Sequence, residues 1–201
     1  MFRSILVLES PWDSKSVKSK SVWPFVSEFA GAIGIKAFHQ TFSDKGSFCH
    51  WIARYNKEKL TDPKLLYVAT HGSDGRISGL QRDINGITIR AALKRAKNIR
   101  FVHFGSCLYG TPDNLTQLLK EARHLLWAAG YNKSVDWVDS TLFDVLLWGR
   151  IAQRDKHTKG LKTHTLAKDC LEEVPGLSKN LGFCFQYRYG KKIESLIDGR
   201  S

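Results

Sequence analysis

The stretches LLYVATHG at residues 65–72 and FVHFGSC at residues 101–107 decide how this chain folds. Each begins with a continuous apolar run, the pattern of a strand that is buried on both faces of a parallel sheet. Each then ends in a residue with a reactive side chain, His71 in the first stretch and Cys107 in the second. Because parallel strands end at one edge of their sheet, the pattern predicts that His71 and Cys107 lie at neighbouring strand ends.

Similar apolar runs and helical patterns alternate around these two stretches. Further strands are predicted at residues 4–8, 35–39 and 125–129, and helices at 22–33, 113–122 and 138–148. Two more helices are predicted, one that Asp44 caps and that extends through Tyr55, and one that Thr88 caps and that extends through Ala96. Residues 72–86 are rich in glycine and aspartate and predict a small hairpin. The alternation favours right-handed crossovers and an α/β fold, with a mostly parallel sheet covered by helices on both faces.

The length of 201 residues fits a single domain, residues 1–201, with a core at about residues 1–150. Residues 151–201 are predicted to add a polar linker after Lys156, a helix at 165–173 and a strand at 182–189 that pairs at a sheet edge. No apolar run approaches the roughly 20 residues that span a bilayer, and residues 2–8 are too short for a signal peptide. The sequence therefore predicts a soluble, cytoplasmic protein.

The four cysteines, Cys49, Cys107, Cys170 and Cys184, show neither metal-site spacing nor a CxxC pair. Four free thiols in a reducing compartment are the expectation, with no metal and no cofactor. Only Cys107 is expected to be reactive, and the other three are expected to be structural.

The net charge of +12 favours an acidic partner, which could be nucleic acid, an anionic membrane or an acidic protein. The basic residues form only small groups, such as residues 94–97 and 188–192, and no zinc finger or arginine-rich arm is present. Nucleic-acid binding is therefore the less favoured interpretation, and a solvated basic surface is the alternative.

His71 and Cys107 together have the chemistry of a cysteine nucleophile with its acid/base partner. A thiol must lose its proton to attack a carbonyl, and a nearby imidazole can take that proton and later protonate a leaving amine. Backbone N–H groups at Gly72 and Cys107 could face the developing oxyanion, while Gly105 leaves the approach to the sulfur uncrowded. Taken singly, a cysteine at a strand end is more often a small buried residue, and a loop histidine a surface residue.

An apolar strand ending in Thr-His-Gly, followed by a second ending in Gly-Ser-Cys, resembles the caspase-like fold of clan CD cysteine peptidases. The resemblance extends from the first strand to about Trp148 and implies a three-layer αβα sandwich, as in caspases and haemoglobinases. It is nearest to small bacterial stand-alone caspase-like proteins and to CHAT and separase proteases. It implies an endopeptidase in which His71 and Cys107 form the dyad, with a protein or peptide substrate and a possible activating partner.

The sequence departs from caspases at Gly105, where they have glutamine, and the arginines that select aspartate are not recognisable. In separase and CHAT proteases, a strand with a tryptophan precedes an acidic stretch that holds a basic side chain. Trp127 and the stretch with Asp136 and Asp139 resemble that arrangement. Asp136, or else Asp139, is therefore predicted to select arginine or lysine before the scissile bond, with Gly105 and Trp127 also lining the substrate site. The alternative is that Asp139 or Ser140 caps a helix and Asp136 is solvated.

Two further interpretations remain open beside the peptidase. The chain could be a catalytically silent caspase-like module that recruits an acidic partner, or a nucleic-acid-binding protein. His103, inside the strand at 99–104, is predicted to be a packed core residue, and Asp74 and Asp83 are predicted to form turns.

Overall fold

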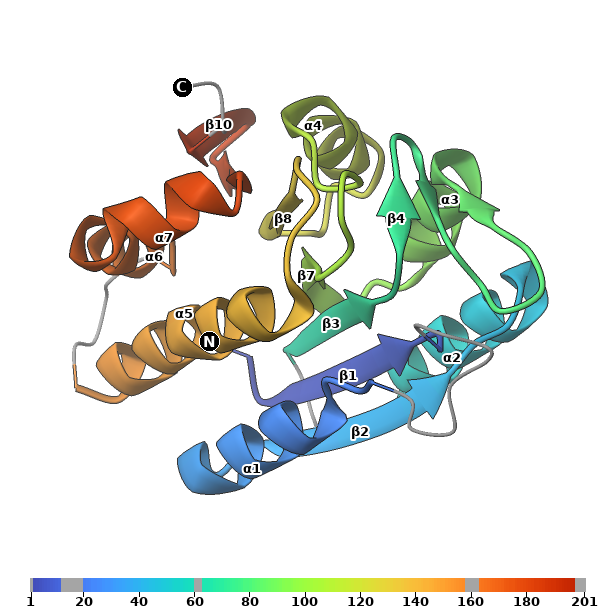
Figure 1. Cartoon of the computed structure of the whole chain (residues 1–201), viewed down its shortest axis with the longest axis horizontal. Coiled ribbons are helices and arrows are strands. Elements are labelled where there is room, and N and C mark those ends of the chain that lie inside the picture. The colour runs from blue at the N-terminus through green and yellow to red at the C-terminus, as the bar shows by residue number, and fades with distance from the viewer. Residues whose placement is uncertain (1, 12–19, 60–62, 158–162, 198–201) are drawn as a thin grey trace.

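In the computed structural model, a seven-stranded sheet forms the centre of the molecule (Figure 1). Residues 2–11, 20–59, 63–157 and 163–197 are described. The strands of this sheet are β1 (Ser4–Glu9), β2 (Lys36–Thr41), β3 (Lys64–Ala69), β7 (Ile99–Phe104), β8 (Trp127–Tyr131), β9 (Phe183–Tyr189) and β10 (Lys192–Ile197). Their order across the sheet is β10-β9-β8-β7-β3-β1-β2. Strands β1, β2, β3, β7 and β8 run parallel to one another. Strand β9 pairs antiparallel with β8, and β10 pairs antiparallel with β9. The predicted mostly parallel sheet is therefore confirmed.

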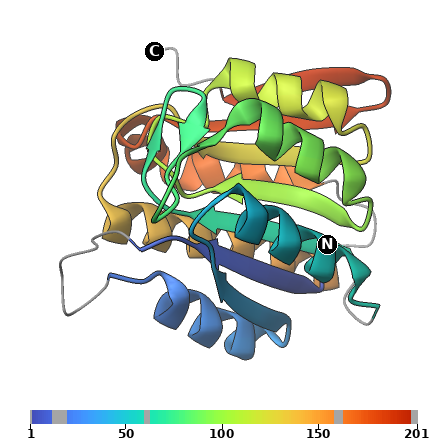
Figure 2. The same cartoon turned by 90° about the vertical axis from the view of Figure 1, so that its right-hand side faces the viewer.

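Helices cover both faces of the sheet. Three of them, α2 (Lys45–Lys57), α3 (Gly86–Arg95) and α4 (Pro112–Glu121), lie side by side on one face (Figure 2). On the other face lie α1 (Trp23–Ile33), α5 (Trp137–His157) and α6 (Thr163–Glu173), and the short α7 (Pro175–Asn180) follows α6. The three-layer sandwich that the sequence predicts is thereby confirmed.

The continuous apolar runs are explained by the two cores that the sheet separates. In β3, Leu66 and Val68 pack beneath α2–α4, while Leu65 and Tyr67 pack against the opposite helices. All four side chains are buried. Since successive strand residues point to opposite faces, a strand with helices on both sides must be apolar at every position.

A second, three-stranded sheet lies beyond the end of β3. It consists of β4 (Gly72–Ser73), β5 (Arg76–Ile77) and β6 (Ile84–Asn85) in sequential antiparallel order. The turn between β4 and β5 contains Asp74 and Gly75, and Gly75 has a φ of 72°. The predicted hairpin and the turn role of Asp74 are therefore confirmed.

Several predicted boundaries were wrong by a few residues. The strand predicted at 125–129 lies at Trp127–Tyr131, and Asn85, three residues before Thr88, caps α3. Helix α4 begins at Pro112, with Thr111 as its cap, because proline is tolerated in the first turn, where its missing N–H costs nothing. The last aromatic run forms β9 between β8 and β10, so β10 is the sheet edge. Residues 158–162 of the predicted linker lie outside the described residues.

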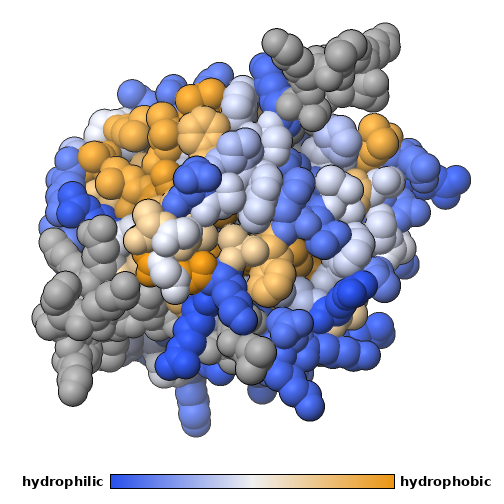
Figure 3. Space-filling view, turned by 90° about the horizontal axis from the view of Figure 1, so that it is seen from below, coloured by the Kyte–Doolittle hydropathy of each residue, from blue (hydrophilic) through white to orange (hydrophobic). Residues whose placement is uncertain are grey.

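None of the described helices is long and apolar enough to cross a membrane. An apolar area is nevertheless exposed over α1 and α5, at the upper left of the view from below (Figure 3). The shallow groove there is lined mainly by Phe29, Ala32, Ile33, Leu142, Val145 and Leu146. Leu142 is 47% exposed, so part of this area faces solvent.

Candidate active site

The strands β3 and β7 are neighbours, and each is followed directly by one of the two predicted catalytic residues. Val68 of β3 is paired in register with Phe104 of β7, so both strands end at the same level of the sheet. His71, after β3, is exposed, and Cys107, after β7, is partly buried. The topology therefore brings both residues to one edge of the sheet.

The loop that carries Cys107 is fixed by backbone hydrogen bonds on both sides. The N–H of Gly105 donates to the carbonyl of Val68 at 2.9 Å, which ties the loop to β3. On the other side, the N–H of Leu108 donates to Lys133 O at 3.2 Å, and the N–H of Gly110 donates to Tyr131 O at 3.0 Å. The position of Cys107 is thus set by main-chain contacts to two segments of the chain, β3 and the end of β8 with the residues that follow it.

The backbone is strained immediately after Cys107. Leu108 has a φ of 61°, and it is the only residue other than glycine with a positive φ in the described part of the chain. The N–H of Tyr109 donates to the carbonyl of Cys107 at 2.7 Å across this residue, which is the pattern of a γ-turn with a positive central φ. Such strain concentrates at functional sites, because only a surrounding structure that over-determines the conformation can hold it.

The sulfur of Cys107 lies against the backbone of Val135, in the segment between β8 and α5. The N–H of Val135 donates to Sγ at 3.4 Å, and the thiol in turn lies 3.7 Å from the Val135 carbonyl that can accept from it. An N–H that faces the sulfur stabilises negative charge there. This contact was missed in the sequence because a backbone group leaves no mark on residue type.

The loop after β3 is held by the small sheet and packs directly against the cysteine loop. Thr70 Oγ1 donates to Ser78 O at 2.6 Å, and the N–H of Ser78 donates to the carbonyl of His71 at 2.8 Å. A Cβ placed on Gly72 would collide with the carbonyl oxygen of Cys107 and would lie 3.1 Å from Ser106 Cβ. Glycine at position 72 is therefore required for the two loops to touch.

The predicted specificity residue Asp136 follows Val135, whose backbone contacts the sulfur. Its side chain accepts from the N–H groups of Val138 at 2.8 Å and Asp139 at 3.2 Å, so it caps the start of α5. Asp136 and Asp139 are both exposed, and Asp139 lies in the first turn of the helix. Asp136 thus combines a helix cap with an exposed carboxylate near Cys107, while neither Asp139 nor Ser140 is the cap.

Two of the residues predicted to line the substrate site do not do so. Gly105 is buried, and a Cβ there would lie 2.5 Å from the hydroxyl of Tyr67, so the glycine is explained by packing beneath the loop. Trp127 is 1% exposed and is stacked between Phe101 and Phe185 at the opposite end of β8. Its indole belongs to the core because β8 begins, rather than ends, at this residue.

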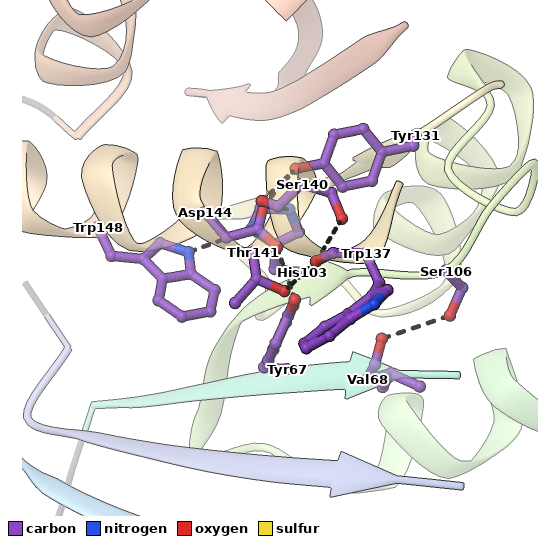
Figure 4. A network of polar contacts seen from close by, with 10 residues as sticks. All are labelled: Tyr67, Val68, His103, Ser106, Tyr131, Trp137, Ser140, Thr141, Asp144 and Trp148. Atoms are coloured by element: carbon purple, nitrogen blue, oxygen red, sulfur yellow. Dashed lines mark hydrogen bonds and ion pairs between the residues drawn. The ribbon is translucent and has the colours of Figure 1, made fainter. Parts of the chain in front are cut away.

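A buried polar cluster lies between the sheet and α5 (Figure 4). Asp144 of α5 accepts from Tyr67 at 2.7 Å and from Tyr131 at 2.5 Å, and its Oδ1 lies 2.9 Å from His103 Nε2. Trp148 Nε1 donates to His103 Nδ1 at 3.1 Å. Because an indole N–H can only donate, Nδ1 of His103 is the acceptor in this contact.

The two tyrosines of this cluster have pKa values well above the ordinary value of a tyrosine. Burial, followed by the nearby Asp144 carboxylate, raises the pKa of Tyr67 and of Tyr131 well above the ordinary value. His103 has no exposed surface and its Nδ1 accepts from Trp148, so it is a core residue, as predicted. The sequence did not reveal Asp144, whose partners come from three separate strands.

A second buried carboxylate, that of Glu9, lies at the end of β1. It accepts from the N–H of Val22 at 3.0 Å and from Ser21 Oγ at 2.7 Å, and it lies 3.0 Å from His39 Nε2. Val22 caps α1 without a side-chain hydrogen bond of its own, so Glu9 supplies the missing acceptor.

Within the described residues, no three His, Cys, Asp or Glu side chains are grouped in a way that could hold a metal ion.

Comparison with known proteins identifies the fold. No model of a known protein family matches the chain, and neither does any curated protein sequence. The structure is similar to caspase-1 from Spodoptera frugiperda, with a TM-score of 0.52 and 12% identity over 84% of this chain and 76% of that one. It is also similar to a secreted C11 cysteine protease from Bacteroides thetaiotaomicron, with a TM-score of 0.58 and 11% identity over 92% of this chain and 65% of that one. The chain therefore has a caspase-like fold.

Proposed function

We propose that this protein is a cysteine endopeptidase in which Cys107 is the nucleophile and His71 the general acid/base. One observation supports this assignment above the others: Gly72 packs against the carbonyl of Cys107, which puts the loops after β3 and β7 in contact at one sheet edge. The strained turn at Leu108 and the N–H of Val135 that faces the sulfur add to it. The similar structures of two cysteine proteases are consistent with this chemistry but establish only the fold.

The reaction would proceed through a thioester. His71 takes the proton of the Cys107 thiol, and the thiolate attacks the carbonyl carbon of the scissile bond, so a sulfur–carbon bond forms and the oxygen becomes an oxyanion. N–H groups of Gly72 and Cys107 donate to that oxyanion. As it collapses, the carbon–nitrogen bond breaks and protonated His71 gives its proton to the leaving amine. His71 then takes a proton from water, whose oxygen attacks the thioester carbon. The sulfur–carbon bond breaks, the acid is released, and protonated His71 returns its proton to the sulfur.

Replacement of the nucleophile tests this proposal directly. The Cys107→Ala variant is expected to lose all turnover of fluorogenic peptides and to keep its melting temperature, because the thiol is partly exposed and carries little packing. Cys49→Ala is the matched control, since Cys49 is the other partly buried thiol. Turnover that survives in Cys107→Ala would refute the mechanism.

Thiol labelling provides an independent measurement. Burial raises the pKa of the Cys49 thiol, so at neutral pH it should react slowly with iodoacetamide, while Cys107 reacts first. Peptide mapping by mass spectrometry after a short pulse would identify the labelled residue. Equal labelling of both cysteines would argue against an activated nucleophile at Cys107.

We further propose that Asp136 selects arginine or lysine before the scissile bond, with Asp139 as the second candidate. Asp136 is exposed and adjacent in sequence to the residue that contacts the sulfur. Asp136→Asn separates the charge from the helix cap, because asparagine caps as well as aspartate. That variant is expected to keep its stability but lose the preference for arginine over matched neutral peptides, while Asp136→Ala also loses about 1 kcal/mol of stability. A wild-type preference for aspartate would contradict the assignment.

The alternative is a catalytically silent module with the same fold. The net charge of +12 favours this role for an acidic partner, including nucleic acid. A peptidyl electrophile that labels Cys107 in the wild type, but not in a His71→Ala variant, would favour the peptidase. An absence of labelling together with tight, salt-dependent binding of an anionic polymer would favour the module.

A further inference from the structure

A groove between α2 and α3, with a volume of about 490 Å³, has an apolar floor. Ile52 lies at its base, and Ala53, Ala91 and Ala92 line its walls. Ile87, at the start of α3, also borders the groove and is 70% exposed, the highest exposure of any large apolar side chain described. Small walls beside an exposed isoleucine allow the backbone of another chain to approach closely. None of these residues belongs to the candidate active site.

The rim of this groove is positively charged. Lys45, Lys57 and Arg95 line it, and no acidic residue does. Neither α2 nor α3 contains an aspartate or a glutamate. Elsewhere on α3, Arg90 is paired with Glu121 at 2.8 Å, whereas none of the three rim cations forms an ion pair with a described residue. Asp44 directly precedes Lys45 and Glu58 directly follows Lys57 in the sequence, but neither lines the groove. The groove thus offers an apolar surface whose lining charges are all positive.

We propose that this groove binds a short amphipathic helix of a partner protein, with apolar residues facing the floor and acidic residues facing the rim. The helices α2 and α3 lie side by side on the outside of the molecule, and a third helix can pack into the channel between two others (Figure 2). The ten residues of α3 extend over about 15 Å, which matches roughly three turns of a partner helix.

The apolar floor favours such a helix over a nucleic acid. A phosphate backbone would be bound by the rim cations, but it would cover Ile87 and the alanines without any apolar contact. An acidic amphipathic helix satisfies both features at once, because its leucines bury the floor and its carboxylates meet Lys45 at one end and Lys57 and Arg95 toward the other. The mode of binding does not depend on catalysis by Cys107.

A synthetic helical peptide of about three turns serves as the probe, with leucines at i, i+3 and i+7 and glutamates on both flanks. A second peptide carries lysines in place of the glutamates. Fluorescence anisotropy of the labelled peptides with the full chain should show binding of the first and at least tenfold weaker binding of the second. Equal binding of the two peptides, or no binding of the first, would overturn the proposal.

A matched pair of charge reversals locates the binding site. Arg95 lines the groove and Lys94, the preceding residue of the same helix, does not, although both are exposed. Arg95→Glu is expected to weaken binding about tenfold or more, and Lys94→Glu by less than about twofold, although both change the net charge equally. Ile87→Asp should also weaken binding about tenfold without a loss of stability. Equal effects of the two reversals would show attraction to overall charge and would refute a defined site.

Cys49 provides a second measurement because it lines the same groove. In a Cys107→Ala background it is the only partly exposed thiol described, so its slow alkylation can be followed alone. The glutamate peptide should slow that alkylation at least threefold, and the lysine peptide should not. A single-stranded oligonucleotide that binds with the same dependence on Arg95 and protects Cys49 equally would identify a polyanion site instead and overturn the helix proposal.

Discussion

The same two strands supply two very different regions, the buried cluster around His103 and the exposed edge around His71. β3 contributes Tyr67 to the cluster and leads on to His71, while β7 contributes His103 and leads on to Cys107. In the cluster both carboxylate oxygens of Asp144 accept from tyrosine hydroxyls, Oδ1 lies 2.9 Å from His103 Nε2, and Trp148 donates to His103 Nδ1. At the edge, the loops are held almost entirely by backbone contacts.

The buried cluster around His103 stabilises the protein, whereas the exposed edge around His71 is where a substrate could react. Side chains whose partners are all inside the protein rigidify it but have no capacity left for a substrate. Loops that are placed by main-chain hydrogen bonds do not depend on buried side-chain clusters for their position. The comparison teaches that His103 belongs to the core because of the groups that surround it, and not because of its distance in sequence from Cys107.

The largest effect is expected from exchanging the two histidines separately for alanine. His71→Ala should lower the rate of peptide cleavage by about 10²–10⁴-fold, the usual contribution of general acid/base catalysis, and leave the melting temperature unchanged. His103→Ala should lower the melting temperature strongly, because it removes a fully buried ring and the partner of Trp148. Loss of activity by His103→Ala at full stability would break the comparison.

The next largest effect concerns the carboxylate of the buried cluster. Asp144→Ala leaves two tyrosine hydroxyls and His103 Nε2 without their common partner, so it is expected to cost about 3–5 kcal/mol of unfolding free energy. Asp139→Ala, on the exposed side of the same helix, is the control and should cost less than about 1 kcal/mol. Urea denaturation measures the unfolding free energy of each variant. Similar decreases for Asp144→Ala and Asp139→Ala would show that the buried cluster adds no more stability than an exposed carboxylate does.

The smallest effect should come from the strained residue at the edge. Leu108→Gly removes the penalty of a left-handed conformation and is expected to raise the free energy of unfolding by up to about 1 kcal/mol. Leu108→Val keeps an apolar side chain but adds a β-branch, so it should lower that free energy. If strain helps to position Cys107, the glycine variant should also cleave more slowly despite its greater stability. A less stable glycine variant would show that Leu108 is not strained.

The fold could be anticipated because its signals are local. A continuous apolar run records burial on both faces of a strand, so residues 65–69 and 99–104 indicated adjacent parallel strands from their composition alone. The glycine-rich hairpin and the core position of His103 followed in the same way. The predicted start of a helix was less accurate where two residues could serve as its N-cap. Thr88 was predicted to cap α3, but Asn85, three residues earlier, is the cap and accepts from the N–H of Thr88.

The site could be anticipated only in part. Gly105 and Trp127 were assigned to the substrate by analogy of position, yet Gly105 is packed on Tyr67 and Trp127 on two phenylalanines. Asp136 proved to be the cap of α5, a role that the sequence pattern assigned to its neighbours. Each error has one cause: the contacts that decide these roles come from segments far apart in the chain.

The sequence by itself determined the alternation of strands and helices as far as α5 and the placement of His71 and Cys107 just after two of the strands, while α7 and β10 were not predicted. Only the tertiary structure decided that Val135 contacts the sulfur, that Gly72 touches the cysteine loop, and that a basic groove opens between α2 and α3. The physical reason is that burial periodicity is encoded residue by residue along one segment. Backbone contacts and grooves arise only where distant segments meet, and no single segment carries a record of them.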